Sequence, residues 1–355
     1  MDLHVLGWNR YFQQYWETHA RSGLAPARVV EEQKEAYRVV GETGELAAEA
    51  TGRLRHGASD RSAFPAVGDW VAMAPILSEG KALIHEVLPR RTKISRKIAG
   101  GRTAEQILVT NVDVAFIVMS LNADFNPRRL ERYVAAIWES GAQPVVLLSK
   151  ADLCADRRNA ANEIADVAPA VNTHILSAVT GEGLDALAAY LEPGNTVVLL
   201  GSSGVGKSTI INRLLRSETQ KTLAIRSSDD RGRHSTTYRR LFLLPAGGVL
   251  IDTPGMREFQ LWDADTGLDD TFDEIGMLSV NCRFRDCQHN TEPGCAVLEA
   301  SANGSLDPDR LANYRKLKRE LQFLGRKRDP TAQAELRKRW KQIHKAQKQI
   351  YKSKA

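Results

Sequence analysis

The spacing of apolar and polar residues changes near residues 36, 98 and 271. Before residue 36, the aromatic side chains of residues 8–19 recur at helical spacing and predict a short amphipathic arm. From residue 36 to about residue 97, short runs of β-forming residues alternate with Gly, Pro and Ser clusters. Five closely spaced strands predict a small barrel, either an OB-fold, which we favour, or an SH3-like barrel. The predicted strands are Tyr37–Val40, Glu45–Leu54, Asp69–Leu77, Lys81–Leu88 and Thr92–Ser95.

Residues 98–270 alternate apolar runs with amphipathic ones. Continuous apolar runs are typical of a parallel sheet that helices cover on both faces, so this region predicts an α/β domain. After Thr271 the alternation ends, and helical basic stretches broken near Gly325 and Asp329-Pro330 follow. The predicted strands are Ile107–Thr110, Val114–Ser120, Pro144–Leu148, His174–Leu176, Thr196–Leu200 and Val249–Ile251. The predicted helices are Pro127–Ser140, Arg157–Ala168, Leu184–Leu191 and one that starts at Ser208.

Length and composition indicate a soluble protein with several domains. A chain of 355 residues is longer than one core supports, and 43% hydrophobic and 26% charged residues are ordinary values. We predict an N-terminal arm (1–35), a barrel (36–97), an α/β domain (98–270) and a C-terminal domain (271–355). No apolar run is long enough to span a membrane, and no secretory signal is visible. We therefore expect a cytoplasmic monomer that does not contact membranes.

Residues 201–208 read Gly-Ser-Ser-Gly-Val-Gly-Lys-Ser, between a predicted strand and a predicted helix. This context is typical of a phosphate-binding loop, whose backbone N–H groups surround the phosphates. Lys207 would reach the β- and γ-phosphates, and the Ser208 hydroxyl would bind Mg²⁺. A chance Gly-rich turn is the alternative. The predicted phosphate-binding residues are Gly201, Ser202, Ser203, Gly204, Val205, Gly206, Lys207, Ser208 and Thr209.

Two further segments fit a bound triphosphate. Asp252 ends a predicted strand and would hold Mg²⁺ through water, and the N–H of Gly255 would contact the γ-phosphate. Residues 232–237 are polar, and either Thr236 or Thr237 would bind Mg²⁺ in the triphosphate state. Met256 stands where GTPases usually carry a glutamine that orients water, so we expect His234 to orient or deprotonate the attacking water. A surface histidine in a loop is the alternative. The predicted catalytic residues are His234, Lys207, Thr236 and Thr237.

Ser149-Lys150-Ala151-Asp152 follows another predicted strand and suits guanine recognition. The Asp152 carboxylate can accept hydrogen bonds from both N1–H and N2–H₂ of guanine, a pair of donors that adenine lacks. The Lys150 stem would lie along the base, and Ser177-Ala178 would offer a backbone N–H to its O6 atom. An ordinary solvated loop is the alternative. Ser149 departs from the Asn or Thr that GTPases usually carry at this position.

The order of these segments differs from that of an ordinary GTPase. The guanine-reading segments at 149–152 and 177–178 precede the phosphate loop, whereas they usually follow it. A circular permutation of one nucleotide-binding domain gives this rotated order. Such a permutation is tolerated because the termini of a domain usually lie close together at its surface.

Three of the four cysteines lie within fourteen positions, together with one histidine. Cys282, Cys287, His289 and Cys295 provide three soft thiolates and one imidazole, a set that suits a tetrahedral structural Zn²⁺. Unpaired thiols are the alternative. Few cysteines in an intracellular chain argue against a disulfide framework, and Cys154 is predicted to be a small packing residue.

The net charge of +6 is unevenly distributed. From Arg310 to the end there are 16 Lys and Arg residues and three acidic ones, so the rest of the chain is acidic. A basic tail on an acidic body is typical of nucleic-acid binding. A solvated helical face is the alternative.

Several of these motifs together resemble the RsgA/YjeQ-type circularly permuted GTPases. The resemblance rests on the rotated motif order, residues 232–237, residues 252–255, the Cys/His segment 282–295 and Val67–Val71. Family members carry Thr where this chain has Ser235. The resemblance implies an N-terminal OB-fold, a permuted GTPase domain and a C-terminal zinc domain, with one structural Zn²⁺ per chain and Mg²⁺ with GTP.

The same resemblance implies a GTPase that depends on the small ribosomal subunit and acts late in maturation of the 30S subunit. Its partners would be GTP or GDP, 16S ribosomal RNA and the 30S subunit, from which hydrolysis releases it. Two other functions remain open from the sequence. One is a nucleotide-regulated RNA-binding module with incidental turnover, which Met256 favours. The other is an ATP-dependent kinase, which Asp152 and residues 252–255 disfavour.

Overall fold

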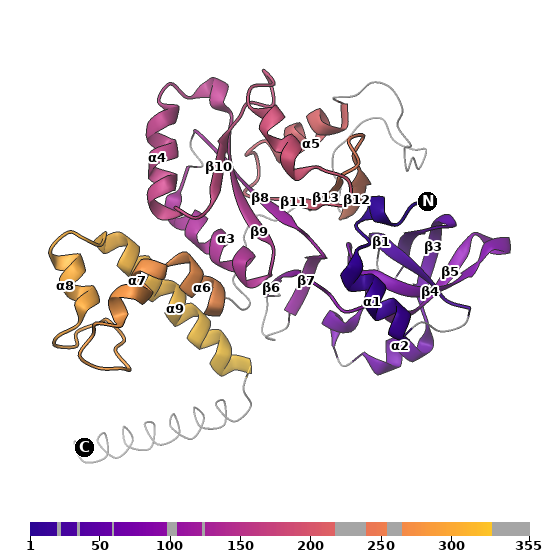
Figure 1. Cartoon of the computed structure of the whole chain (residues 1–355), viewed down its shortest axis with the longest axis horizontal. Coiled ribbons are helices and arrows are strands. Elements are labelled where there is room, and N and C mark those ends of the chain that lie inside the picture. The colour runs from indigo at the N-terminus through magenta and orange to yellow at the C-terminus, as the bar shows by residue number, and fades with distance from the viewer. Residues whose placement is uncertain are drawn as a thin grey trace, which may run out of the picture.

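A computed structural model describes residues 1–19, 23–33, 36–58, 60–97, 105–122, 125–216, 239–253 and 265–328. These residues form a β-barrel, an α/β domain and a helical C-terminal part (Figure 1). Among the described helices, none has the length and apolar character needed to cross a membrane.

The barrel closes from five strands, of which the first was not predicted. β1 (Ala25–Gln33) pairs with both β2 (Ala36–Gly41) and β4 (Trp70–Ile76). β3 (Gly44–Ala50) and β5 (Lys81–Val87) complete the ring, in the order β1-β2-β3-β5-β4. This closed five-stranded barrel fits the predicted OB-fold. β1 lies inside the segment that was predicted to be an arm. The strand was missed because charged residues interrupt its apolar pattern.

Two strand predictions for the barrel are wrong in detail. The run Thr92–Ser95 does not enter the barrel, because β1 already occupies the place between β2 and β4. Instead β6 (Lys93–Lys97) pairs with β7 (Glu105–Thr110) in a separate two-stranded sheet. The predicted strand Glu45–Leu54 ends at residue 50 because Thr51 caps a short helix, α2 (Gly52–Gly57). The Thr51 Oγ1 atom accepts a hydrogen bond from the N–H of Leu54, at 3.3 Å.

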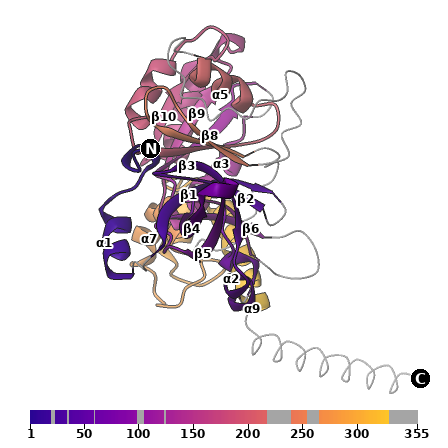
Figure 2. The ribbon, with the colours of Figure 1, turned by 90° about the vertical axis from the view of Figure 1, so that its right-hand side faces the viewer.

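The N-terminal segment covers the barrel and does not extend away from it. Helix α1 (Arg10–His19) confirms the predicted amphipathic arm. The rings of Trp8 and Phe12 lie 4.8 and 5.8 Å from that of Trp70, a buried residue of β4. Aromatic pairs at such distances are stabilising beyond the area that they bury. Figure 2 shows α1 beside the barrel strands.

The α/β domain contains a parallel sheet that is buried on both faces, as predicted. Five strands lie in the order β10-β9-β8-β11-β13, and β12 runs antiparallel beside β13. Helices α3 and α4 cover one face, and helix α5 with the 3₁₀ helix η5 covers the other. η5 lies where an α-helix was predicted from residue 184. The strands are β8 (Val114–Ser120), β9 (Gln143–Ser149), β10 (Asn172–Ile175), β11 (Thr196–Leu200), β12 (Arg240–Leu243) and β13 (Val249–Asp252). The helices are α3 (Pro127–Glu139), α4 (Arg157–Val167), η5 (Leu184–Tyr190) and α5 (Lys207–Arg216).

The sheet of the α/β domain continues into the barrel. β12 pairs with β13 on one side and with β1 of the barrel on the other, where Arg240 is opposite Glu31. The result is one eleven-stranded sheet. Nothing in the sequence pattern predicted this continuity, because a single long-range strand pair has no signature along the chain.

A buried arginine strengthens the junction between the barrel and the α/β domain. Arg28 is 1% exposed and donates hydrogen bonds to the carbonyl oxygens of Leu6, Gly68 and Asn111. Burial lowers the pKa of Arg28 to about 10, so its guanidinium stays charged at pH 7. Gly68 has a φ of +98°, and a Cβ there would lie 2.2 Å from the carbonyl oxygen of Thr110. The motif at residues 67–71 therefore brings the two domains into close contact.

Residues 265–328 of the C-terminal part contain four helices, of which α6 and α9 pack against α3. A Cβ at Gly267 of α6 would lie 2.0 Å from the carbonyl oxygen of Ala135 in α3, so glycine permits this close approach. α9 runs through Gly325, so the break predicted there is wrong, since helix formers flank a single glycine that costs only about 1 kcal/mol. Asp329-Pro330 and the rest of the tail lie outside the described residues. The helices are α6 (Asp265–Thr271), α7 (Asp273–Ser279), α8 (Ala296–Ala302) and α9 (Pro308–Arg328).

Arg310 of α9 joins this part to the α/β domain. Its buried guanidinium donates to Glu131 of α3 at 2.8 Å and to the carbonyl oxygen of Thr271 at 2.8 Å, and it also pairs with Glu274. It lies over the ring of Phe272, with its Cζ atom 4.7 Å from the centroid. Because Arg310 is satisfied inside the protein, it does not belong to an RNA-binding tail. A buried ion pair of this kind orients helices more than it adds stability.

Candidate functional site

Four of the predicted nucleotide-binding segments meet at one edge of the parallel sheet. β9, β10, β11 and β13 run parallel, and each is followed by one of these segments. The carboxyl ends of parallel strands share an edge, which is where α/β proteins bind ligands. The structure therefore brings residues 149–152, 177–178, 201–208 and 252 to the same side of the domain, although they are distant in sequence.

The backbone of the phosphate loop requires its glycines. Gly201, Gly204 and Gly206 all have φ angles between +82° and +139°, and a Cβ at Gly201 would lie 2.3 Å from the carbonyl oxygen of Val118. Helix α5 begins at Lys207, so the unpaired N–H groups of its first turn lie directly after the loop. Backbone N–H groups in this arrangement are suited to binding an anion.

Lys207 lies over its own loop. Its ammonium donates hydrogen bonds to the carbonyl oxygens of Gly201 and Ser202, both at 2.6 Å. These contacts hold the charge beside the loop N–H groups before any ligand arrives. A phosphate oxygen at the loop would therefore meet a cation that is already positioned.

Ser149 ties the guanine-reading segment to the phosphate loop. Its buried hydroxyl lies 2.5 Å from the carbonyl oxygen of Val205 and 3.2 Å from that of Met119. A hydroxyl has one proton to donate, and the shorter distance identifies Val205 as the acceptor. The residue that departs from the usual Asn or Thr thus keeps a polar link to the loop backbone.

The Asp152 carboxylate is oriented by a serine that was predicted for a different role. The Ser177 hydroxyl donates to Asp152 and accepts a hydrogen bond from the N–H of Thr180 at 3.2 Å. The N–H of Ala151 donates to the carbonyl oxygen of Leu176 at 3.1 Å and joins the two loops. Ser177 and Ala178 were predicted to supply a backbone N–H, and no pattern along the chain indicated a role for the Ser177 side chain.

The end of β13 is held against the strand that leads into the phosphate loop. The buried Thr253 hydroxyl donates to the carbonyl oxygen of Leu199 in β11, at 3.0 Å. This bond sets the position of Asp252, the last residue of β13, relative to the loop. Asp252 and Ser208, both predicted to bind magnesium, therefore lie at the same sheet edge.

Other predicted residues lie outside the part of the chain that the structure describes. They are His234, Thr236 and Thr237 in the segment 217–238, and Gly255 and Met256 in the segment 254–264. Their roles stay predictions from the sequence.

The Cys/His segment forms a cluster with the dimensions of a zinc site. The ligand atoms of Cys282, Cys287, His289 and Cys295 all lie within 4.8 Å of one another. The Sγ atoms of Cys282 and Cys295 are 3.8 Å apart, and the Nδ1 atom of His289 lies 3.7 and 3.5 Å from them. Ligands at Zn–S and Zn–N bond lengths around a tetrahedral ion would be about 3.8 Å and about 3.6 Å apart. The donor set and its spacing therefore fit Zn²⁺.

The surroundings of the cluster favour metal binding. Burial lowers the pKa of His289, as do the nearby cations Lys318 and Arg315, against the opposing effect of Glu292. The shift favours the neutral imidazole. Neutral imidazole is the form that binds a metal ion. Arg315 of α9 also donates to the carbonyl oxygen of His289, so a second tail cation has an internal partner.

Glu292, which was not among the predicted site residues, organises the loop between the ligands. Its carboxylate accepts hydrogen bonds from the N–H groups of Gln288, Asn290 and Thr291, at 3.0, 2.7 and 3.0 Å. Backbone hydrogen bonds, including one from its own N–H, lower the pKa of Glu292 to about 2. Its position between two predicted ligands, in Glu292-Pro293-Gly294-Cys295, was the available signal.

Known proteins with similar sequences identify the family of this chain. The family model for RsgA GTPase matches residues 87–262. The chain is 46% identical to a Small ribosomal subunit biogenesis GTPase RsgA from Opitutus terrae, over 98% of this chain and 97% of that protein. It is 49% identical to a protein of the same name from Methanosarcina acetivorans, over 74% of this chain and 71% of that protein.

Two solved structures resemble the fold. The crystal structure of YjeQ from Thermotoga maritima matches with a TM-score of 0.62 and 25% identity, covering 84% of this chain and 99% of that one. That of YloQ, described as a circularly permuted GTPase, matches with a TM-score of 0.60 and 22% identity, covering 88% and 98%. The permuted fold is thus confirmed, and the Opitutus terrae relative aligns over nearly the whole chain. The chain belongs to the RsgA GTPase family.

Proposed function

We propose that this protein hydrolyses GTP and acts in assembly of the small ribosomal subunit. The observation that carries the proposal is the meeting of residues 149–152, 177–178, 201–208 and 252 at one sheet edge. The name shared by its relatives, which describes small-subunit biogenesis GTPases, gives the process.

In this proposal the triphosphate lies along residues 201–209. The loop N–H groups and the first turn of α5 bind phosphate oxygens, and Lys207 leaves the carbonyls of its own loop to contact the β- and γ-phosphates. Ser208 and Asp252 hold Mg²⁺, with Thr236 or Thr237 added in the triphosphate state. The ion, when bound, neutralises charge on the phosphates. From the sequence, the N–H of Gly255 contacts the γ-phosphate and His234 orients the attacking water.

Guanine is selected by Asp152. Its carboxylate is held by the Ser177 hydroxyl and retains an acceptor for the guanine N1–H and N2–H₂ donors. Lys150 has a φ of +58° and lies directly before the turn at 151–153. Its side-chain stem would lie along the base. The N–H of Ala178 would donate to the O6 atom.

Zn²⁺ at Cys282, Cys287, His289 and Cys295 would be structural. All four positions are protein ligands, which leaves no open position for a substrate. A bound ion would hold the loops between α7 and α8 together. It would thereby fix the surface that this part presents to a partner.

The binding partner is the 30S subunit, and 16S ribosomal RNA is the molecule contacted by the barrel and the basic tail. GTP binding and hydrolysis would change the affinity, because the sequence after Asp252 continues into the C-terminal part and β12 joins β13 to the barrel. Hydrolysis would then release the protein. We propose that it works as a monomer in the cytoplasm.

The test is GTP and ATP hydrolysis measured side by side, with and without purified 30S subunits. We expect turnover of GTP alone and a strong increase with 30S subunits. Equal use of ATP would contradict the guanine assignment. GTP turnover that 30S subunits leave unchanged would instead indicate an RNA-binding protein with incidental turnover.

A further inference from the structure

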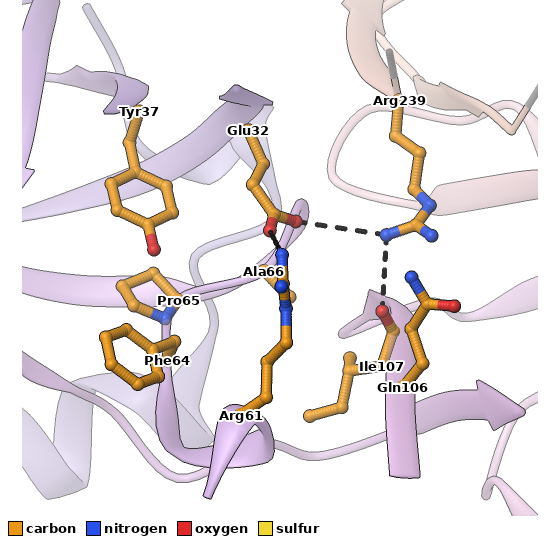
Figure 3. Close-up of a pocket in the computed structure, with 9 residues that line it drawn as sticks. All are labelled: Glu32, Tyr37, Arg61, Phe64, Pro65, Ala66, Gln106, Ile107 and Arg239. Carbon is orange, nitrogen blue, oxygen red and sulfur yellow. Dashed lines mark hydrogen bonds and ion pairs between the residues drawn. The ribbon is translucent and has the colours of Figure 1, made fainter. Parts of the chain in front are cut away.

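A cavity of about 250 Å³ lies between the barrel and β7 (Figure 3). None of the residues that line it belongs to the nucleotide motifs or to the zinc cluster. Its volume is just below the range of about 300–1,000 Å³ typical of pockets for drug-sized ligands. The cavity therefore suits a small group of one ring and its substituents.

One wall of the cavity is apolar and aromatic. Figure 3 shows Tyr37, Pro65 and Phe64 in a row on one side, with the charged residues opposite them. Tyr37 is 4% exposed and so is held firmly in the barrel. Rigid aromatic side chains at the wall of a cavity are suited to contact with a planar ring.

The other wall carries an excess of positive charge. The Glu32 carboxylate lies between two guanidiniums, at 3.8 Å from Arg61 and 3.8 Å from Arg239. Arg239 also donates to the carbonyl oxygen of Ile107 at 3.2 Å, whereas the Arg61 side chain is 70% exposed. Burial lowers the pKa of Arg239 and the Glu32 carboxylate raises it. The like charges of Arg96 and Arg61 lower it as well. An anion at this wall would thus relieve repulsion between cations.

The cavity lies one strand away from the nucleotide edge. Arg239 immediately precedes β12, whose first residue, Arg240, is opposite Glu31 of β1 and opposite Asp252 of β13. A ligand that holds Arg239 would therefore contact the strand between the barrel and Asp252. This places the cavity where it can affect the nucleotide site.

We propose that this cavity binds one unpaired nucleotide of an RNA partner. The base would lie against the half-buried ring of Phe64, with Tyr37 supporting the wall behind it, and the adjacent phosphate would pair with Arg61 at the open side. Aromatic stacking beside arginine is the usual way in which proteins bind single-stranded RNA, and a base in a duplex could not enter. The proposal rests on the proposed function for its RNA partner, and it adds where and in which form that RNA is bound.

The test uses the full chain with a fluorescently labelled six-nucleotide single-stranded RNA, followed by anisotropy at several salt concentrations. Arg61→Ala should weaken binding about tenfold and reduce the salt dependence by about 0.7 in log–log slope, the value for one phosphate contact on a single strand. Phe64→Leu keeps an apolar side chain but removes the ring, so it should weaken binding about tenfold without changing that slope.

The matched control is Arg55→Ala, which removes one exposed cation of α2 that does not line the cavity. It should leave affinity nearly unchanged. Equal losses in the Arg55 and Arg61 variants would indicate diffuse charge attraction and overturn the proposal. Wild-type affinity in Phe64→Leu, with an unaltered melting temperature, would also overturn it.

Two further arms identify the source of the ligand and separate this proposal from the proposed function. Adenosine monophosphate should compete only weakly with the labelled RNA, and competition as strong as that of the unlabelled RNA would make the cavity a free-nucleotide site. A lack of stimulation of GTP hydrolysis by 30S subunits would remove the proposed function. The differences in RNA affinity between the Arg61, Phe64 and Arg55 variants would still test whether the cavity binds RNA.

Discussion

At the zinc cluster, all four ligands come from fourteen consecutive positions, whereas the nucleotide edge collects residues from 149 to 252. Side chains that belong to the protein complete the zinc cluster. At the nucleotide edge, the protein supplies backbone N–H groups and Lys207 over its loop, and the ligand would supply the negative charge. The first site depends on local chain geometry and the second on the whole sheet. Damage to the zinc cluster should therefore stay local, and damage to the nucleotide edge should affect activity without unfolding.

The largest effect should follow removal of a zinc ligand. Cys287→Ser should abolish stoichiometric zinc, because structural sites supply about 10–16 kcal/mol of folding free energy in small zinc domains. Metal analysis and hydrogen exchange should report zinc loss and faster exchange in residues 273–302, with GTP affinity retained. Cys154→Ser is the control and should keep its zinc. Loss of GTP binding in the Cys287 variant would mean that the two sites are not independent.

Lys207→Ala should have the reverse effect to Cys287→Ser, with loss of activity and retention of zinc. Losing one positioned charge at the phosphates should reduce the rate of hydrolysis by about 100- to 1,000-fold. Zinc content and melting temperature should be unchanged, because the ammonium donates to carbonyl oxygens of its own loop, far along the chain from the Cys/His cluster. A fall in zinc content would show that the nucleotide edge and the zinc cluster are coupled.

Asp152→Asn sharpens the comparison by changing specificity alone. An amide cannot accept from both guanine donors, so the preference for GTP over ATP should fall by about 10- to 100-fold, as for loss of a charged hydrogen bond. Asp166→Asn, on the exposed face of α4, is the matched control. Competition between labelled GTP and unlabelled ATP measures the preference. An unaltered preference would remove Asp152 from guanine recognition.

The smallest effect should come from Glu292→Gln, which weakens the loop around the zinc ligands. The folded-state pKa of about 2 lies below the ordinary value of 4.5, so the stabilisation is complete above that ordinary value. It is lost as the pH falls toward the folded value. The difference in melting temperature between wild type and variant should thus be constant at neutral pH and shrink in acid. Zinc transfer to a chelator at pH 7 should be about tenfold faster in the variant. A difference that grows in acid would contradict this role.

Much of this protein was predictable because its signals are local. The phosphate loop, the Cys/His spacing and the buried strands at 114–120 and 196–200 each depend on short-range periodicity or on glycine conformations, and the structure contains all of them. Local pattern could not separate a strand of the barrel from one outside it, and so β6 was misplaced and β1 was missed.

Only the tertiary structure decided which distant groups meet. The sequence determined the permuted motif order, the phosphate loop and the Cys/His set of potential metal ligands. The fold then placed Ser177 against Asp152, Ser149 against Val205 and Arg310 between α3 and α7. The fold also joins the barrel strands to the sheet of the α/β domain, where Glu31 of β1 pairs with Arg240 of β12. Such contacts depend on strand order and domain packing, which are set by long-range burial and leave no regular spacing along the chain.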